Sequence, residues 1–256
     1  MDGDFPDGVA LVVGGSGGIG SASAKMLALR GSDVALTYFG GASKAEVVAE
    51  DIRASGRKAS IHRLDLGDAE ACVALANQLE STCGRVHAVV HAAGSRISQP
   101  YVSEMDLDEW KRVLDSDVNG FLHVAKAFIP HFRQKGGGSF TFVSSAGLRR
   151  FPPGDVLSVG PKGAIEALLR AIAREEGRHA IRANAVGIGV VDAGMFPDLV
   201  ARGELDATWI AAATKNIALR RFAKSDEVAE AIAFLASSRA SYITGQSVML
   251  DGGFSL

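Results

Sequence analysis

Short apolar runs recur along the chain, and the segments between them place apolar residues at helical spacing. The runs lie at residues 9–13, 34–38, 58–64, 86–91, 139–143, 181–186 and 247–250. Short apolar runs bounded by turn residues are typical of buried strands. Strands that alternate with helices form right-handed crossovers, and these build a parallel sheet covered on both faces. The pattern therefore predicts one doubly wound α/β domain over residues 1–256, with about seven strands.

Residues 187–223 form the one long segment without a predicted strand, and they contain Pro197 and Trp209. Insertions of this length in a compact domain often form a lid or a substrate wall beside a fixed site. A pair of surface helices without a function explains the segment equally well. We expect a substrate-side lid at 187–223, and the second explanation stays open. No Pro-rich or Ser-rich linker divides the chain.

The first apolar run leads directly into a glycine-rich turn, in which Gly14, Gly18 and Gly20 have the spacing G-x-x-x-G-x-G. Glycines let a backbone turn tightly and approach a ligand closely. A helix that begins at Gly18 leaves its first amides unpaired, and its dipole favours a phosphate at that end. A strand, a glycine turn and a helix in this order predict a dinucleotide site. Its expected phosphate contacts are Gly14, Ser16, Gly17, Gly18, Ile19 and Gly20.

The residue about twenty positions beyond the glycine turn indicates which dinucleotide is bound, because an acidic residue there holds the adenosine ribose. This chain has Tyr38 at that place and no nearby carboxylate, while Ser43 and Lys44 follow. We expect NADP(H) to be preferred, with NAD(H) still possible, although no arginine of the turn or the strand end clamps a phosphate. Lys44 can equally be a solvated helix residue. Asp65 is expected to bind the adenine amino group or to serve as a turn carboxylate.

Composition excludes several other classes of protein. Hydrophobic residues make up 47% of the chain and the net charge is −2, so neither a nucleic-acid partner nor a membrane partner is expected. Residues 1–8 are acidic and resemble neither a signal nor a transit peptide. The two cysteines, Cys72 and Cys83, are consistent with a reducing cytoplasm, and no metal-binding motif occurs. A cytoplasmic protein with a small-molecule substrate is expected.

Motifs continue to the end of the chain. They are His91-Ala92-Ala93-Gly94, Asp117-Val118-Asn119-Gly120, Val143-Ser144-Ser145, Ile181-Arg182-Ala183-Asn184, Ile243-Thr244-Gly245-Gln246 and Leu250-Asp251-Gly252-Gly253. With the glycine turn they resemble the short-chain dehydrogenase/reductase family, especially its acyl-carrier-protein ketoreductase branch. The resemblance spans nearly the whole chain and implies a Rossmann-like fold with an NAD(P) cofactor. The further cofactor contacts that we expect are Leu66, Ala92, Ala93, Gly94, Lys162, Gly189 and Val191.

The resemblance also implies a catalytic tetrad of Asn, Ser, Tyr and Lys. Asn119, Ser145 and Lys162 match three of its members, but Ser158 stands four residues before Lys162, where the tyrosine is expected. Some enoyl reductases place the tyrosine seven residues before the lysine, and that position is Asp155. The expected catalytic residues are therefore Asn119, Ser145, Ser158 and Lys162. A serine hydroxyl is a far weaker acid than a phenol, whose pKa is about 10, and it reaches a shorter distance. Tyr101 is a candidate substitute phenol, although a surface tyrosine without a catalytic role is the more common case.

Pro161 predicts where the helix that carries Lys162 begins. Proline inside a helix removes an amide and clashes with the preceding turn, so we expect the helix to begin near Pro161, with Gly160 close to the N-cap. Lys162 would then be displaced from its family position. After the sixth strand, Ile188 and Ala193 stand where the family commonly has a proline and a threonine for the nicotinamide carboxamide.

Two functions are consistent with these departures. The first is an NADP-dependent oxidoreductase that transfers a hydride to or from a small carbonyl, enone or imine, and this is the function that we favour. The second is a non-catalytic, regulatory protein that binds the dinucleotide without turnover. The resemblance further implies a homotetramer, or a homodimer. Its interfaces would use residues 107–132 and 164–173 and the C-terminal Phe254-Ser255-Leu256.

Overall fold

The computed structural model describes residues 3–203 and 205–256 of the chain. Three residues of the predicted segments lie outside the described residues. They are Met1 and Asp2 of the acidic segment 1–8, and Glu204 of the segment 187–223. A seven-stranded sheet of order β3-β2-β1-β4-β5-β6-β7 forms the centre, and all neighbouring strands are parallel. The strands are β1 (Val9–Val13), β2 (Asp33–Tyr38), β3 (Ala59–Arg63), β4 (Val86–His91), β5 (Gly138–Ser145), β6 (Ile181–Ile188) and β7 (Ser247–Leu250). The predicted doubly wound α/β fold is confirmed.

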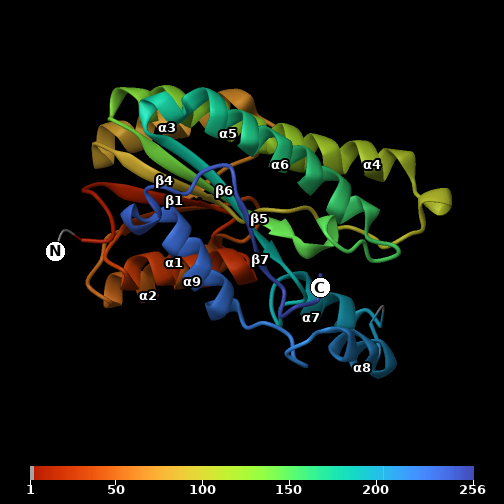
Figure 1. The fold of residues 1–256 in the computed structure, drawn as a ribbon. Helices are drawn as coiled ribbons and strands as arrows, with labels where there is room; N and C mark the ends of the chain where they lie inside the picture. Colours follow the sequence, from red (N-terminus) through yellow and green to blue (C-terminus); the bar gives the residue numbers. More distant parts are fainter. Residues whose placement is uncertain (1–2, 204) are drawn as a thin grey trace.

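Helices cover both faces of the sheet (Figure 1). On one face lie α1 (Gly18–Leu29), α2 (Ala42–Ala54) and α9 (Ser225–Ala236), and on the other lie α3 (Ala69–Cys83), α4 (Leu107–Val113), α5 (Gly120–Gln134) and α6 (Val156–Glu176). A π-helical turn, Leu114–Asn119, joins α4 to α5. The short helices α7 (Met195–Ala201) and α8 (Ala207–Asn216) lie beyond one end of the sheet. Single 3₁₀ turns occur at Val102–Glu104, Ala146–Leu148, Gly177–His179 and Ser238–Ala240.

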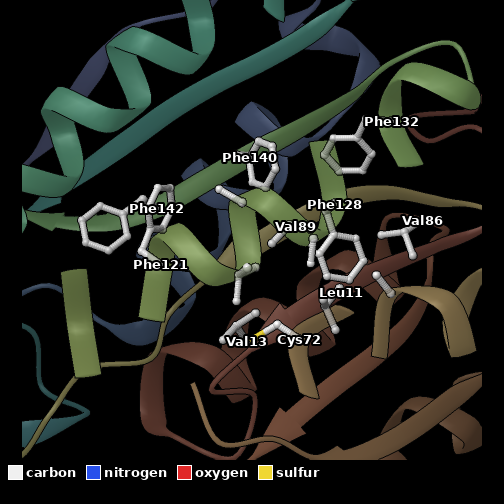
Figure 2. Close-up of a cluster of buried hydrophobic side chains, with 14 of the residues drawn as sticks. Leu11, Val13, Cys72, Val86, Val89, Phe121, Phe128, Phe132, Phe140 and Phe142 are labelled. Atoms are coloured by element: carbon white, nitrogen blue, oxygen red, sulfur yellow. The ribbon is translucent and has the colours of Figure 1, made fainter. Parts of the chain in front are cut away.

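Aromatic side chains fill the layer between the sheet and α5. Figure 2 shows Phe121, Phe128 and Phe132 of α5 beside Phe140 and Phe142 of β5. The ring centroids of Phe132 and Phe140 are 5.1 Å apart, and those of Phe121 and Phe142 are 5.7 Å apart. Because protein interiors are close-packed, this layer fixes how far α5 lies from the sheet.

His91, at the end of β4, belongs to the same aromatic layer. Its ring lies 5.4 Å from that of Phe121 and 5.9 Å from that of Phe142. Complete burial lowers the pKa of His91 to about 4, so the ring is neutral at physiological pH. The side chain therefore serves as an aromatic part of the core, and the backbone after it is left to form the site.

The order of the strands creates a crevice at the carboxyl end of the sheet. From β1 the chain builds outward through β2 to β3, and it then returns to place β4 on the other side of β1. Ligands of doubly wound folds bind where the order reverses in this way. At this point the turns after the two strands touch, because a Cβ added to Gly14 would lie 2.7 Å from the backbone nitrogen of Ala93.

The expected late start of the Lys162 helix is wrong, because α6 begins at Val156 and contains Pro161 in its second turn. The helix begins earlier because the backbone carbonyl of Asp155 accepts hydrogen bonds from the amides of Ser158 and Val159. Leu157, in the first turn, is completely buried. This packing outweighs the cost of an interior proline, which is about 3 kcal/mol. Lys162 consequently lies within a continuous helix.

The described residues contain neither a membrane-spanning helix nor a cluster of metal ligands. None of their helices combines the length and the apolar character that a membrane crossing requires. No three of their His, Cys, Asp or Glu side chains gather closely enough to hold a metal ion. Cys72 and Cys83 are both free, and only Cys83 is exposed.

The first prediction concerns the core. We expect Leu79→Ala to lower the free energy of unfolding by about 2–5 kcal/mol, because this leucine of α3 is fully buried and the shortened side chain leaves a cavity. Leu29→Ala, at the end of α1, is the matched control, since its side chain is 74% exposed and its loss should cost less than about 0.5 kcal/mol. Denaturant unfolding measures both values. Equal costs would contradict the described packing.

Candidate functional site

The glycine turn leaves the start of α1 open. Gly17 is the N-cap of this helix, and neither a side-chain cap nor an acidic residue occupies its first turn. The amides of Gly18, Ile19 and Gly20 have no carbonyl acceptor earlier in the helix. Helix α3, by contrast, has the Asp68 side chain as its cap. The open amides of α1, together with the helix dipole, make a site for an anion.

Close backbone contacts explain why this turn consists of glycines. A Cβ added to Gly18 would lie 2.5 Å from the backbone nitrogen of Gly194, and one added to Gly20 would overlap the carbonyl oxygen of Gly14. Gly14 itself has a φ of 79°, which L side chains rarely adopt. The amide of Gly14 donates to Thr37 Oγ1 over 3.1 Å, so β2 holds the turn in place. The segment after β6 thus lies directly against the start of α1.

The residues expected near the adenosine end gather where β2 leads into α2. A Cβ added to Gly41 would lie 3.4 Å from Ser16 Oγ and 4.0 Å from Cβ of Lys44, so both residues border the same corner. Ser43 is exposed in the first turn of α2, and that turn has neither a side-chain cap nor an acidic residue. Tyr38 ends β2 and is partly buried.

An arginine that the sequence analysis missed lies at this end of the sheet. Arg63 pairs with Tyr38 in the parallel register of β3 and β2, and its guanidinium lies 5.9 Å from the centre of the Phe39 ring. The register of the two strands could have revealed this residue, because the last residues of neighbouring parallel strands lie side by side.

One carboxylate oxygen of Asp65 serves the turn that follows β3, as expected of a turn carboxylate. Asp65 Oδ1 accepts a hydrogen bond of 2.9 Å from the amide of Gly67. The adjacent Leu66 packs where Gly120 leaves room, since a Cβ on that glycine would lie 2.8 Å from the Leu66 side chain. His123 Nδ1 lies 2.8 Å from the Leu66 carbonyl oxygen, so α5 anchors this loop beside the crevice.

The expected cofactor contacts after β4 and β6 also line the carboxyl edge. The amide of Ala92 donates to the carbonyl of Val13, and Ala93 touches Gly14. Gly94 lies close to Asp117, whose Oδ2 would be 4.0 Å from an added Cβ. Beyond β6, the amide of Gly189 donates to the Leu250 carbonyl.

Val191 is buried through its side chain, while its backbone faces the segment around Ala223. The side chain is buried in the apolar core. The hydrogen bonds that join this segment to Ala223 use the carbonyl of Val190 and the amide of Asp192. The amide and carbonyl of Val191 itself are not used in this bridge.

Two expected catalytic residues lie on separate elements. Ser145 ends β5, and its Oγ accepts a hydrogen bond of 3.0 Å from the amide of Gly147, which leaves its own hydrogen free to be donated. Asn119 lies in the π-helical turn and donates through Nδ2 to Asp115 over 2.9 Å. Such π turns are frequent at functional sites.

The other two expected catalytic residues are in contact. Lys162 Nζ donates to Ser158 Oγ over 3.0 Å, and the two lie one turn apart on α6. Burial lowers the pKa of Lys162, while Asp117 and Asp155 oppose this shift through their charges. Asp117 itself accepts hydrogen bonds from the amide and the hydroxyl of Ser95.

Asp155 completes this cluster and was not among the expected site residues. Burial raises its pKa to about 6, against the opposing effects of the Lys162 charge and the Ser158 hydroxyl. The residues at 155, 158 and 162 follow helical spacing, and this spacing could have indicated one shared face. Tyr101, the candidate substitute phenol, is 63% exposed in the loop after β4.

Comparison with known proteins places this arrangement among dehydrogenases and reductases. A family model described as enoyl-(acyl carrier protein) reductase matches residues 13–255. A 3-oxoacyl-[acyl-carrier-protein] reductase of Staphylococcus aureus is 32% identical over 244 residues, which cover 95% of this chain and 96% of that protein.

Two further relatives match over almost their whole length. A cis-4-hydroxycyclohexanecarboxylate dehydrogenase of Sinomonas cyclohexanicum is 32% identical over 250 residues, which cover 98% of this chain and 97% of the dehydrogenase. The structure of a short-chain dehydrogenase/reductase from Serratia marcescens superimposes with a TM-score of 0.90 at 32% identity, covering 99% of this chain and all of the other.

The second prediction follows from the raised pKa of Asp155. Because the folded protein holds this proton up to a pH of about 6, while an unfolded aspartate loses it near 3.8, stability falls as the pH rises between these values. The loss amounts to roughly 3 kcal/mol. We expect the free energy of unfolding of Asp155→Asn not to fall in this way. The difference between the variant and the native chain should therefore rise in favour of the variant between pH 4 and pH 7. Urea unfolding across this range measures it, and parallel curves would contradict the shift.

Proposed function

Since the chain belongs to the short-chain dehydrogenase/reductase family, we propose that it transfers a hydride between a nicotinamide coenzyme and a small carbonyl, enone or imine. One observation carries this proposal: the open amides of Gly18–Gly20 lie at the same edge of the sheet as Ser145 and Lys162. Anion-binding amides and a partly buried ammonium beside one crevice suit a coenzyme of this class. None of the relatives described above supports the alternative of a protein that only binds the dinucleotide.

The residues around the crevice suit the coenzyme. The pyrophosphate would be held by the backbone of residues 14–20, where Gly14, Gly18 and Gly20 leave no room for a side chain. Asp65 and Leu66 would face the adenine, and Ala92, Ala93 and Gly94 would lie along the ribose side. The backbone of Gly189 and Val191 would face the nicotinamide. The bound coenzyme would supply or accept the hydride.

The chain's own residues would position the substrate. The Ser145 hydroxyl has its hydrogen available to polarise a substrate oxygen, because Gly147 uses only its acceptor side. Lys162 would hold the nicotinamide ribose, and Asn119 would fix the helix turn beside it. We place Ser158 at the position of the family's tyrosine. A hydroxyl of this kind does not ionise near neutral pH, so it can pass a proton only as a bridge between Lys162 and another group.

We further propose that NADP(H) is preferred over NAD(H). Arg63 pairs with Tyr38 at the end of β2, Ser43 and Lys44 follow in the first turn of α2, and β2 does not end in an acidic residue that would repel a 2′-phosphate. The uncapped start of α2 adds amides that favour an anion. If Lys44 is only a solvated helix residue, its removal should not change the affinity for NADPH.

We propose that residues 187–223, part of one domain that spans the chain, act as the substrate-side lid. Its base lies against Gly18 through Gly194. The rings of Phe196, Trp209 and Phe222 form a cluster with centroids 5.1–6.5 Å apart. An exposed ion pair of 3.1 Å between Arg96 and Asp198 ties α7 to the loop after β4. Exposed pairs of this kind contribute little energy, so the tie can open.

We also propose that the protein is a cytoplasmic homotetramer, or a homodimer. The basis is the family together with apolar side chains left exposed on the expected interface segments, Leu107 of α4, Leu122 of α5 and the terminal Leu256. The two free thiols are consistent with a reducing compartment.

The third prediction tests the coenzyme site. We expect NADPH to bind the native chain, and Gly18→Ala to raise its Kd at least about tenfold, because the new methyl meets the backbone of Gly194. Gly177→Ala is the matched control, since nothing lies within 4 Å of its added Cβ. Calorimetry measures both constants, and circular dichroism verifies folding.

Turnover tests the proposed reaction directly. NADPH oxidation is followed with a 3-oxoacyl thioester, 4-oxocyclohexanecarboxylate, an enone and an imine as substrates. We expect consumption of at least one of them, and a loss of consumption in Lys162→Ala. A native chain that binds NADPH but oxidises it with none of these substrates would favour the binding-only alternative.

The fourth prediction concerns the 2′-phosphate. We expect Lys44→Ala combined with Arg63→Ala to raise the Kd for NADPH about tenfold or more and to leave the Kd for NADH unchanged, because only NADPH carries the extra phosphate. Lys126→Ala, an exposed lysine of α5 on the opposite face of the sheet from α2, is the control. An equal effect on both coenzymes would contradict the proposed preference.

A further inference from the structure

We propose that Asp155 is the general acid and base of the reaction, giving its proton to the substrate oxygen during reduction and taking it back during oxidation. The inference rests on the proposed function, since it assigns the proton transfer that must accompany the hydride. The Asp155 carboxyl can donate a proton near neutral pH, whereas the Ser158 hydroxyl cannot, because an alcohol is too weak an acid.

The geometry of α6 leaves the Asp155 carboxyl without a backbone partner at the start of the helix. Asp155 is the N-cap residue of the helix, a position where a carboxylate normally accepts hydrogen bonds from the first backbone amides. Here the side chain makes no such bond, and the amides of Ser158 and Val159 bond instead to the Asp155 backbone carbonyl. The carboxyl therefore has the Ser158 hydroxyl as its hydrogen-bonding neighbour and no backbone amide.

Lys162 faces two carboxyl groups, and they differ in their hydrogen-bond partners. Asp117, in the π-helical turn, accepts hydrogen bonds from Ser95 and from Ser116. Asp155 has only the Ser158 hydroxyl and the charge of Lys162 beside it. The Lys162 charge and the Ser158 hydroxyl lower the pKa of Asp155, and Asp117 acts on the same Lys162 from the π-helical turn. Burial keeps that proton on Asp155 up to a pH of about 6.

The first turn of α6 lies beside the other polarising group. A Cβ added to Gly147 would lie 2.6 Å from the Val159 side chain and 3.1 Å from Ser145 Oγ, so the helix start and the end of β5 share one small volume. The Gly147 amide donates to the same Ser145 oxygen. A substrate oxygen held by Ser145 is consequently next to the helix turn that carries Asp155.

The step balances with the coenzyme class named above as reductant. The substrate carbon gains a hydride, the electron pair of the C=O π bond moves to oxygen, and the new O–H bond forms as the Asp155 O–H bond breaks. Asp155 is left as a carboxylate beside Lys162 and Ser158, and it regains a proton from solvent. Oxidation of the alcohol runs the same step in reverse, with the carboxylate as base.

Asp155→Asn tests the assignment, because it keeps the size of the side chain and removes the titrating proton. We expect kcat for reduction to fall about 10²–10⁴-fold while the Kd for NADPH stays within twofold. In the native chain, kcat/KM for reduction should fall tenfold per pH unit above about 6, and the variant should lack this limb. Asp108→Asn, a strongly exposed aspartate of α4, is the control and should change neither quantity.

A second readout needs neither substrate nor coenzyme. In protein labelled with ¹³C at the aspartate carboxyls, the resonance missing from Asp155→Asn identifies this residue. We expect it to titrate near pH 6 in the native chain and at a higher pH in Lys162→Met, because the ammonium lowers the pKa of Asp155. An aspartate exposed to water would titrate near 3.8.

The outcomes separate the two proposals. If NADPH binds and turns over but Asp155→Asn retains native kcat and the native pH profile, the assignment of Asp155 is overturned while the proposed function stands. A resonance that titrates near 3.8 overturns the assignment equally. If the native chain binds no coenzyme, the proposed function fails and the assignment falls with it. Loss of kcat with unchanged coenzyme binding, together with titration near pH 6, supports both.

Discussion

The organisation of this protein depends on a place where backbone meets backbone without side chains between them. The turn after β1 touches the turn after β4 at Ala93, and the segment after β6 touches the start of α1 at Gly18. Three strand ends converge there only because the turn consists of glycines. This convergence places the uncapped amides of the start of α1 beside two other strand ends, where an anion suits them.

Electrostatics divides the same edge of the sheet into two halves. The half near β2 is lined by open helix amides and basic side chains, while the half near α6 places Lys162 between the carboxyls of Asp117 and Asp155. Charges are costly to bury unless they are paired, so the second half holds its groups in a tight arrangement. One half thus suits a stable anion, and the other suits groups that exchange protons.

Much of the fold and part of the site could be predicted from the sequence. Apolar runs located all seven strands, and the glycine spacing located the start of α1 at Gly18, because both depend on local pattern. The start of α6 could not be found in this way, since the burial of Leu157 overrides the local penalty of Pro161. Asp117 was recognised only as part of a family motif, because its place beside Lys162 depends on helix packing. Arg63 could be found only from the pairing of β3 with β2, which the periodicity of one segment does not display.

The π-helical turn between α4 and α5 has a consequence for the helices on either side of it. A turn of this kind holds one residue more than an α-helical turn, so the side chains beyond it are rotated by about 100° from a regular helix. The apolar stripes of α4 and α5 are therefore out of phase, which lets Trp110 reach Gly160 while Phe121 and Phe128 face the sheet. A uniform helical wheel drawn through residues 107–134 would misassign which of its faces is buried.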